Sequence, residues 1–291
     1  MSFKGSMTAL VTPFKAGKVD YASLETLIEF QINEGSHGIV PCGSTGESAT
    51  LDHEEHDAVV RAVVKTVNHR VPVIAGTGSN STQEAIDITR AAEKSGVDGA
   101  LLISPYYNRP TQEGIYRHYR AVAAKVGIPL IVYNIPGRTA SKIEPETLAR
   151  LAEVDNIAGV KQATGSVDQA IDVIQQCGDA LDVYSGEDSL AYSLMALGGK
   201  GVITTVGNIV PGPMAGLANA CLSGDWDTGR RLQIELIPLI RAVFIETNPI
   251  PIKAALALMG KCAAEVRLPM TPMAADNLDA MTAVMRGYDL I

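Results

Sequence analysis

Reactive side chains follow several short apolar runs of this sequence. Lys161 ends the run Ile157–Lys161, and Tyr133 ends the run Pro129–Tyr133. A lysine among apolar residues on a buried strand is desolvated, which favours its neutral amine. A neutral amine attacks ketones to form a Schiff base, and the iminium then serves as an electron sink when the adjacent carbon is deprotonated. The pattern therefore predicts amine catalysis at Lys161, with a lysine merely paired to a buried carboxylate as the alternative.

Schiff-base chemistry also needs a group that moves protons near the iminium. Tyr133 lies one predicted strand before Lys161 and at the same depth, so its hydroxyl can act as a general acid and base if a hydroxyl chain connects it to solvent. Ser44 and Tyr107 are the candidates for that chain. The alternative for each tyrosine is a buried hydroxyl that only hydrogen-bonds a backbone carbonyl.

Two further segments are suited to anions. The turn Gly43–Glu47 (GSTGE) places small residues where backbone N–H groups can converge on a carboxylate or phosphate. Arg138, in the loop after Tyr133, can bind a second carboxylate through its planar guanidinium, unless it is an ordinary solvated arginine. Both segments follow predicted strands, as does Gly186 after the seventh run.

Two other patterns indicate different chemistry but fit it poorly. The segment Gly76–Ser81 resembles a dinucleotide-binding fingerprint, yet serine replaces its third glycine and it follows the third of eight predicted strands. The segment Asp52–His56 reads D-H-E-E-H, which lacks the H-E-x-x-H spacing of a zinc site. Asp52 and Glu55 instead predict a capping box that begins a helix. We therefore expect no nicotinamide cofactor and no catalytic metal.

The elements that must position these residues alternate regularly. Eight short apolar runs bounded by Gly or Pro are separated by segments of helical periodicity, and the runs begin about every 20 to 34 residues, the length of a β–α unit. Uniformly apolar strands indicate a parallel sheet covered on both faces. The prediction is an α/β fold, a (β/α)8 TIM barrel, rather than a doubly wound open sheet, whose edge strands would be shorter or more polar. The predicted strands are Met7–Val11, Gly38–Pro41, Val71–Ala75, Ala100–Ile103, Pro129–Tyr133, Ile157–Lys161, Leu181–Tyr184 and Gly201–Thr204.

Only helical sequence follows the eighth predicted strand, and it exceeds the single helix that a barrel needs to close. We expect a catalytic barrel over residues 1–224 and a small helical C-terminal extension over residues 225–291. The predicted helices here are Met214–Leu222, Asp225–Glu246, Ile250–Met259 and Met273–Arg286.

Composition limits the partners. The 291 residues include 24 Lys and Arg against 32 Asp and Glu, a net charge of −8, which argues against nucleic acid or an anionic membrane as the main partner. No stretch approaches eighteen unbroken apolar residues. The four cysteines (Cys42, Cys177, Cys221 and Cys262) lie far apart without C-x-x-C spacing, which favours free thiols in a reducing compartment. A soluble cytoplasmic protein is expected.

With these residues in view, essentially the whole chain resembles the superfamily of pyruvate-dependent class I aldolases that contains N-acetylneuraminate lyase. Within it, the chain is most similar to the 4-hydroxy-tetrahydrodipicolinate synthase family. The motifs that carry the resemblance are VTPF (residues 11–14), GSTGE (43–47), SPYYNRPTQEG (104–114), VYNIPGRT (132–139) and GVKQATG (159–165).

The resemblance implies a role for each candidate residue in a condensation that needs no cofactor. Lys161 would form the Schiff base with pyruvate. Tyr133 would be the general acid and base, relayed through Ser44 and through Tyr107 of a neighbouring subunit. The pyruvate carboxylate would be held by the turn that contains Thr45. The same pocket would be lined by Gly186 and the backbone of Ile203.

Arg138 would bind the carboxylate of the second substrate, L-aspartate 4-semialdehyde, and it argues against a sister lyase acting on a 2-keto-3-deoxy sugar acid. A non-catalytic sensor of keto acids or lysine would be expected to lack Lys161, Tyr133 or the Ser44 hydroxyl. The chain departs from the family at position 44, where Ser stands in place of the usual Thr. The hydroxyl is kept, but the methyl that restricts its rotamer is gone.

The resemblance extends to a regulatory site of enzymes inhibited by L-lysine, which would lie across a dimer interface of a homo-oligomer, commonly a tetramer built from dimers. Asn80 and Glu84 are four residues apart and are predicted to share one helical face, offering an amide and a carboxylate to an amino acid. Ordinary interface polarity is the alternative. The matched residues are Ser48, Ala49, His53, His56, Asn80, Glu84 and Tyr106.

Overall fold

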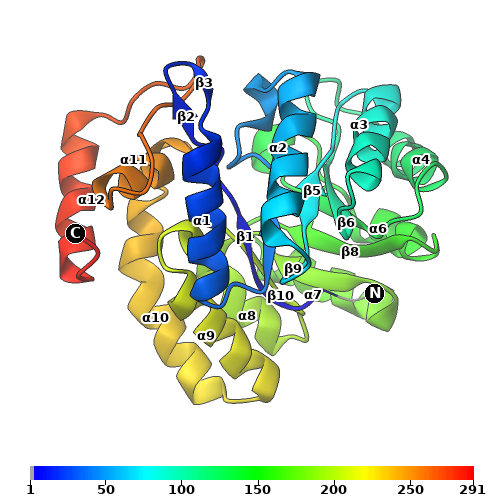
Figure 1. The fold of residues 1–291 in the computed structure, drawn as a ribbon. Helices are drawn as coiled ribbons and strands as arrows, with labels where there is room; N and C mark the ends of the chain where they lie inside the picture. Colours follow the sequence, from blue (N-terminus) through cyan, green and yellow to red (C-terminus); the bar gives the residue numbers. More distant parts are fainter. Residues whose placement is uncertain (1–2) are drawn as a thin grey trace.

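The computed structural model describes residues 3–291, which fold around one eight-stranded parallel sheet (Figure 1). Its strands are short and almost entirely buried, as a sheet covered by helices requires. They are β1 (Gly5–Ala9), β4 (Gly38–Val40), β5 (Ile74–Gly76), β6 (Gly99–Ile103), β7 (Leu130–Asn134), β8 (Ile157–Gln162), β9 (Asp182–Ser185) and β10 (Gly201–Thr204).

The strand order shows that the sheet curls into a barrel. Neighbours run β4-β1-β10-β9-β8-β7-β6-β5, every pair parallel. The gap between the end members is spanned by a parallel bridge between Ile39 and Val73, and the Gly76 amide donates to the carbonyl of Pro41 at 2.8 Å. The predicted (β/α)8 barrel is therefore confirmed, and the open doubly wound sheet is wrong.

Helices connect successive strands and cover the outside of the sheet (Figure 1). Helix α2 begins with the predicted capping box: the Asp52 carboxylate accepts from the Glu55 amide at 2.8 Å, and Glu55 accepts from the Asp52 amide. The connecting helices are α1 (Tyr21–Asn33), α2 (His53–Val67), α3 (Thr82–Lys94), α4 (Gln112–Ala123), α5 (Pro136–Thr139), α6 (Pro145–Ala152), α7 (Val167–Cys177) and α8 (Ala191–Ala196), and α9 (Pro211–Ser223) follows the last strand. Short 3-10 turns are η1 (Ser48–Thr50), η2 (Gly178–Ala180), η3 (Asp188–Leu190) and η4 (Val206–Asn208).

Two of the predicted strands have boundaries that shift by more than one residue, and a small hairpin was not predicted. The third strand begins at Ile74 rather than Val71 because Pro72 has no N–H to donate to a ladder. The first strand spans Gly5–Ala9, two residues earlier than predicted. The hairpin consists of β2 (Phe14–Lys15) and β3 (Lys18–Val19), too short to produce an alternating pattern.

Three helices follow α9: α10 (Trp226–Ala242), α11 (Ile250–Leu258) and α12 (Ala275–Gly287). Pro238 lies inside α10 without ending it. Buried residues of all three helices belong to the same apolar cluster as residues of β10, α1 and α2, so the C-terminal helices pack on the barrel. The division of the chain at residue 224 stays a prediction. Within residues 3–291, none of the helices combines the length and the apolar character needed to cross a membrane.

Candidate active site

A cavity of about 560 Å³ opens at the carboxyl ends of the barrel strands, where barrel enzymes hold their active sites. It collects most of the residues that the sequence singled out. They come from the loop after β4, from β7 and the loop after it, from β8, and from the loop after β9. The predicted residues that line it are Ser44, Thr45, Tyr133, Arg138, Lys161 and Gly186.

Lys161 lies near the end of β8, with its side chain in the barrel interior. The residue is only 5 % exposed, and its Nζ lies 4.3 Å from the centroid of the Tyr133 ring on the neighbouring strand. Burial lowers the pKa of Lys161 to about 8, an effect that the Asp188 carboxylate opposes and the Arg138 guanidinium reinforces. About a tenth of this amine is therefore unprotonated at pH 7, far more than for an ordinary lysine, and the neutral amine is the form that a nucleophile requires.

Gly186 gives the Lys161 side chain its space. A Cβ at position 186 would lie 2.7 Å from the Ala163 Cβ and 3.1 Å from the Lys161 Cε. Any larger residue would push the lysine out of its position. Gly186 thus shapes the cavity through its lack of a side chain.

Tyr133 lies directly opposite Lys161 in the β7–β8 register. Burial raises the pKa of Tyr133 above its ordinary value, while the Arg138 charge lowers it and the Glu187 charge raises it. The hydroxyl therefore stays protonated at neutral pH and can donate a proton to a group bound at Lys161.

The turn Gly43–Glu47 is tightly folded. The Gly46 amide donates to the Gly43 carbonyl at 3.1 Å, the Ser48 amide donates to the same carbonyl at 3.3 Å, and the Thr12 hydroxyl donates to the Gly46 carbonyl at 2.7 Å. Thr45 is buried within it. These contacts fix a small concave backbone at the cavity wall, the kind of site in which a carboxylate can bind.

Asn248 is a site residue that the sequence did not reveal. Its side-chain amide donates to the Thr45 hydroxyl at 2.9 Å, and its carbonyl accepts from Arg138 Nη2 at 2.8 Å. It is buried, lines the cavity, and immediately precedes α11. No local sequence pattern indicates Asn248, because its hydrogen-bond partners, Arg138 and Thr45, lie about 110 and 203 positions away in the chain.

Two acidic residues also went unpredicted. Asp188 is buried at the start of η3, and one of its oxygens accepts from the backbone amides of Thr205 and Val206 at 3.1 and 2.8 Å. Burial raises the pKa of Asp188, against hydrogen bonds from Thr204, Val206 and Thr205 and the charge of Lys161. Glu187 lines the same cavity. Their position directly after Gly186 was the available signal.

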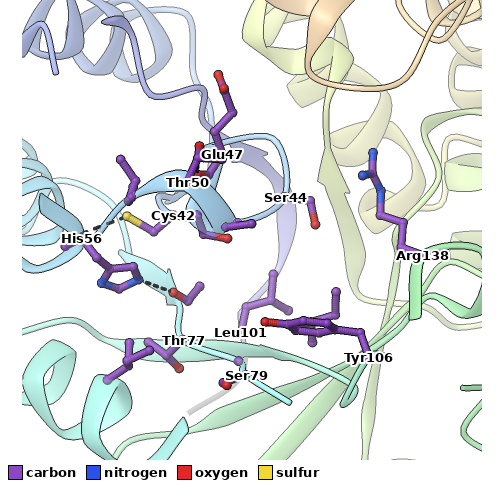
Figure 2. A pocket seen from close by; sticks show the side chains of 18 of the residues that line it. Cys42, Ser44, Glu47, Thr50, His56, Thr77, Ser79, Leu101, Tyr106 and Arg138 are labelled. Atoms are coloured by element: carbon purple, nitrogen blue, oxygen red, sulfur yellow. Dashed lines mark hydrogen bonds between the residues drawn. The ribbon is translucent and has the colours of Figure 1, made fainter. Parts of the chain in front are cut away.

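A second cavity of about 380 Å³ adjoins the first (Figure 2). The two share lining residues, among them Ser44, Tyr133 and Arg138, so Ser44 lies where they meet. Six of the seven residues predicted for a lysine site line the second cavity: Ser48, Ala49, His53, His56, Glu84 and Tyr106.

Hydrogen bonds already organise the polar groups of this second cavity. His53 Nε2 lies 3.0 Å from Glu84 Oε1, the Ser79 hydroxyl donates to the other Glu84 oxygen, and His56 Nε2 lies 2.8 Å from the Gly76 carbonyl. The hydrogen bond from Ser79, followed by His53, lowers the pKa of Glu84. Glu84 is thus a charged acceptor at the cavity wall.

Two sequence predictions differ from the geometry of the chain, and a third, for Tyr107, concerns the active site of a neighbouring subunit. Asn80 and Glu84 do not share a helical face: α3 begins at Thr82, so Asn80 lies before its cap Ser81, does not line the cavity, and donates to the Tyr106 carbonyl at 3.2 Å. Ile203 is packed in the barrel interior with Tyr133 and does not line the first cavity. Tyr107 is 90 % exposed and lines neither cavity.

Comparisons with known proteins assign the chain to a family. Residues 2–287 match the Dihydrodipicolinate synthetase family. The chain belongs to this family. The 4-hydroxy-tetrahydrodipicolinate synthase of Syntrophobacter fumaroxidans is 57 % identical over 290 residues, which cover 99 % of this chain and all of the relative. This chain is accordingly an enzyme, a lyase of the synthase type.

Solved structures of family members superpose over the whole chain. Dihydrodipicolinate synthase from Acinetobacter baumannii, crystallised with pyruvate, gives a TM-score of 0.98 at 43 % identity and covers both chains completely. The enzyme from Cyanidioschyzon merolae, crystallised with lysine bound, gives a TM-score of 0.96 at 37 % identity over 99 % of each chain.

Proposed function

We propose that this enzyme condenses pyruvate with L-aspartate 4-semialdehyde, as a cytoplasmic 4-hydroxy-tetrahydrodipicolinate synthase that opens the diaminopimelate route to L-lysine. The observation that carries the proposal is the buried pair of Lys161 and Tyr133, a nucleophilic amine with its pKa lowered to about 8 beside a protonated hydroxyl. Family membership, and the relative that was crystallised with pyruvate, support the same first substrate.

The chemistry begins when the Lys161 amine attacks the ketone carbon of pyruvate. The ketone oxygen of pyruvate is protonated through Tyr133 and leaves as water, and an iminium between Lys161 and pyruvate remains. Loss of a methyl proton gives the enamine, whose carbon attacks the aldehyde of the second substrate and forms the new carbon–carbon bond. The amino group of that substrate then attacks the iminium carbon and displaces Lys161, which closes the ring and frees the amine.

Each substrate carboxylate has a suitable group in the cavity. Among the described residues, the amides of Gly46 and Glu47 donate within the turn, which leaves those of Ser44 and Thr45 for the pyruvate carboxylate. Arg138 has only the Asn248 carbonyl as its described hydrogen-bond partner, so its guanidinium keeps donors for the carboxylate of the semialdehyde. A sister lyase specific for a 2-keto-3-deoxy sugar acid would need neutral hydrogen-bonding groups here.

The second cavity supports feedback inhibition by L-lysine. Glu84 and His53 provide a carboxylate and an imidazole for the two ends of an amino acid, and the relative crystallised with lysine supports the ligand. Because the cavity meets the active site at Ser44, lysine bound there can displace that hydroxyl from the proton relay. Lysine bound in the second cavity would in this way slow proton transfer in the active site.

A homo-oligomer completes the proposal. Tyr107, almost fully exposed in the single chain, can reach the active site of a second copy across a dimer interface and join the Tyr133 and Ser44 relay. A tetramer built from two such dimers is the expected assembly.

The decisive experiment measures pyruvate-dependent condensation with L-aspartate 4-semialdehyde, beside a panel of sugar aldehydes and with or without L-lysine, on wild type and Lys161→Ala. The expected result is turnover confined to the semialdehyde, lowered by lysine and lost in Lys161→Ala. Borohydride trapping of pyruvate with turnover of another aldehyde only would refute the role of Arg138. Absence of any adduct would favour a sensor.

A further inference from the structure

A fully buried ion pair joins the turn Gly43–Glu47 to the C-terminal helices. Lys253 Nζ lies 2.6 Å from Glu47 Oε1, and the two side chains are 0 % and 3 % exposed. Glu47 is the last residue of the turn and has a left-handed backbone conformation (φ 54°). Lys253 belongs to α11, more than two hundred residues later in the chain.

The pair is closely supported on all sides. Lys253 Nζ also lies 4.1 Å from the centroid of the Phe14 ring, and the second Glu47 oxygen accepts from the Arg267 amide at 3.0 Å. Removing two charges from water is expensive, and only good geometry with further hydrogen bonds offsets that cost. A buried ion pair is therefore weak evidence that the pair stabilises the fold. Its position beside the turn needs another explanation.

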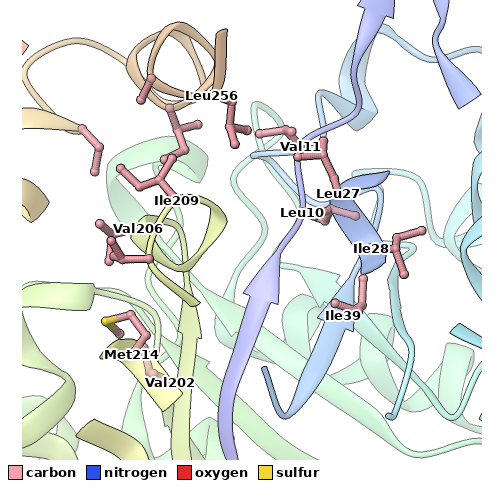
Figure 3. Packing of buried hydrophobic residues seen from close by; sticks show 14 of the residues in the cluster. Leu10, Val11, Leu27, Ile28, Ile39, Val202, Val206, Ile209, Met214 and Leu256 are labelled. Atoms are coloured by element: carbon pink, nitrogen blue, oxygen red, sulfur yellow. The ribbon is translucent and has the colours of Figure 1, made fainter. Parts of the chain in front are cut away.

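Helix α11, which carries Lys253, is packed against the barrel through buried apolar side chains. Leu256, one turn after Lys253, belongs to the same buried cluster as Val11 and Ile209, and Figure 3 shows these side chains between α11 and the barrel. Asn248, just before the helix, donates to the hydroxyl of Thr45 in the middle of the turn. Residues in and just before α11 therefore contact the turn at both Thr45 and Glu47.

The turn itself needs this support. A Cβ at Gly46 would lie 3.0 Å from the Cys42 nitrogen, and neither Gly43 nor Gly46 has a side chain whose packing could hold the turn in one conformation. A site that binds a small anion through backbone amides works only when those amides stay in place, because a hydrogen bond weakens as its length and angle depart from their preferred values.

We propose that Lys253 is a positioning residue for the reaction: acting through Glu47, it fixes the turn Gly43–Glu47 in the conformation that binds the pyruvate carboxylate. This inference rests on the proposed function, because it takes pyruvate as the ligand of the turn. It gives the C-terminal helices a part in substrate binding and does not place Lys253 in contact with substrate.

The test measures the pyruvate concentration that gives half-maximal borohydride-trapped adduct on Lys161 in the full-length enzyme. Lys253→Met removes the cation and keeps the length of the side chain. We expect the half-saturating concentration to rise about tenfold or more, with the rate of trapping at saturating pyruvate within about threefold of wild type. Lys261→Met is the matched control, since Lys261 also lies over an aromatic ring, that of Phe30 at 3.6 Å, but away from the turn.

The double variant Glu47→Gln/Lys253→Met separates positioning from folding. It leaves no unpaired buried charge, so its melting temperature should return toward that of wild type. A folded double variant that still needs about tenfold more pyruvate supports the inference, because the anchor is gone. A folded double variant with wild-type half-saturation overturns it and leaves the pair a purely structural one. A wild-type enzyme that forms no pyruvate adduct overturns the proposed function, and this inference with it.

Discussion

Tyr133 and Lys161 lie directly opposite each other on neighbouring parallel strands, with the lysine Nζ 4.3 Å from the centre of the tyrosine ring. Burial shifts their pKa values in opposite directions, raising that of Tyr133 and lowering that of Lys161 to about 8. Both shifts favour the neutral forms. One buried environment therefore produces a nucleophilic amine and a protonated acid at the same depth in the barrel.

The pKa of Lys161 predicts the pH dependence of pyruvate binding. Below pH 8 the amine is mostly protonated and cannot attack, so kcat/KM for pyruvate should fall about tenfold per pH unit and should level off above pH 8. Asp188→Asn removes a carboxylate that raises this pKa, so the midpoint should move to lower pH. An unchanged midpoint in Asp188→Asn would show that the two charges do not interact.

Tyr133→Phe tests the proton transfer separately from the nucleophile. The ring that lies over Lys161 remains, but the hydroxyl is lost, so formation of the adduct and turnover should both slow by about 10²- to 10⁴-fold. The adduct should still reach full stoichiometry after long incubation, as judged by mass after borohydride trapping. Adduct formation at the wild-type rate would assign the proton transfer to another group.

Arg138→Met tests the recognition of the second substrate. Loss of the guanidinium should lower kcat/KM for L-aspartate 4-semialdehyde by about 10²-fold, since a charge-assisted pair of hydrogen bonds is removed. At pH 9, where the contribution of Arg138 to the lowered pKa of Lys161 matters least, borohydride trapping of pyruvate should persist, and turnover of propanal, an aldehyde without a carboxylate, should change little. Equal losses for both aldehydes would show that Arg138 supports the site rather than the specificity.

Sequence patterns predict the strands, several site positions and a helix cap, because each of these depends on residues close together in the chain. Apolar runs at regular spacing predicted the barrel, and positions just after those runs predicted Lys161, Tyr133, Arg138 and Gly186, since the carboxyl ends of parallel strands meet at one face. The capping box at Asp52 was equally readable, because both of its partners lie within one helical turn.

Contacts between distant segments were beyond such patterns. Asn248 and Lys253 contact the turn Gly43–Glu47 only because α11 folds back over the barrel, which no periodicity records. The shared helical face of Asn80 and Glu84 was wrong for a different reason. Ser81 caps α3 through the Glu84 amide, so the helix begins after Asn80, and four-residue spacing across a helix boundary carries no facing relationship.

Glu84→Gln should weaken inhibition by L-lysine. Its carboxylate, charged because hydrogen bonds from Ser79 and His53 lower its pKa, is the natural partner of an ammonium in the second cavity. The lysine concentration for half-inhibition should rise about tenfold or more, with turnover in the absence of lysine near wild type. Glu113→Gln, an exposed carboxylate paired with Arg117 and Arg150 on the surface, is the matched control. Equal lysine sensitivity in both variants would place the regulatory site elsewhere.

Ser44→Thr should make the enzyme faster. Ser44 lies half-buried where the two cavities meet, so its hydroxyl can turn between several rotamers, of which only some connect Tyr133 to the rest of the relay. The added methyl restricts that rotation and should raise kcat by about two- to fivefold, the value of a partly recovered rotamer entropy. Ser44→Ala removes the hydroxyl and should lower kcat well below wild type. If Ala and Thr at this position gave the same kcat as Ser, the relay would not pass through residue 44.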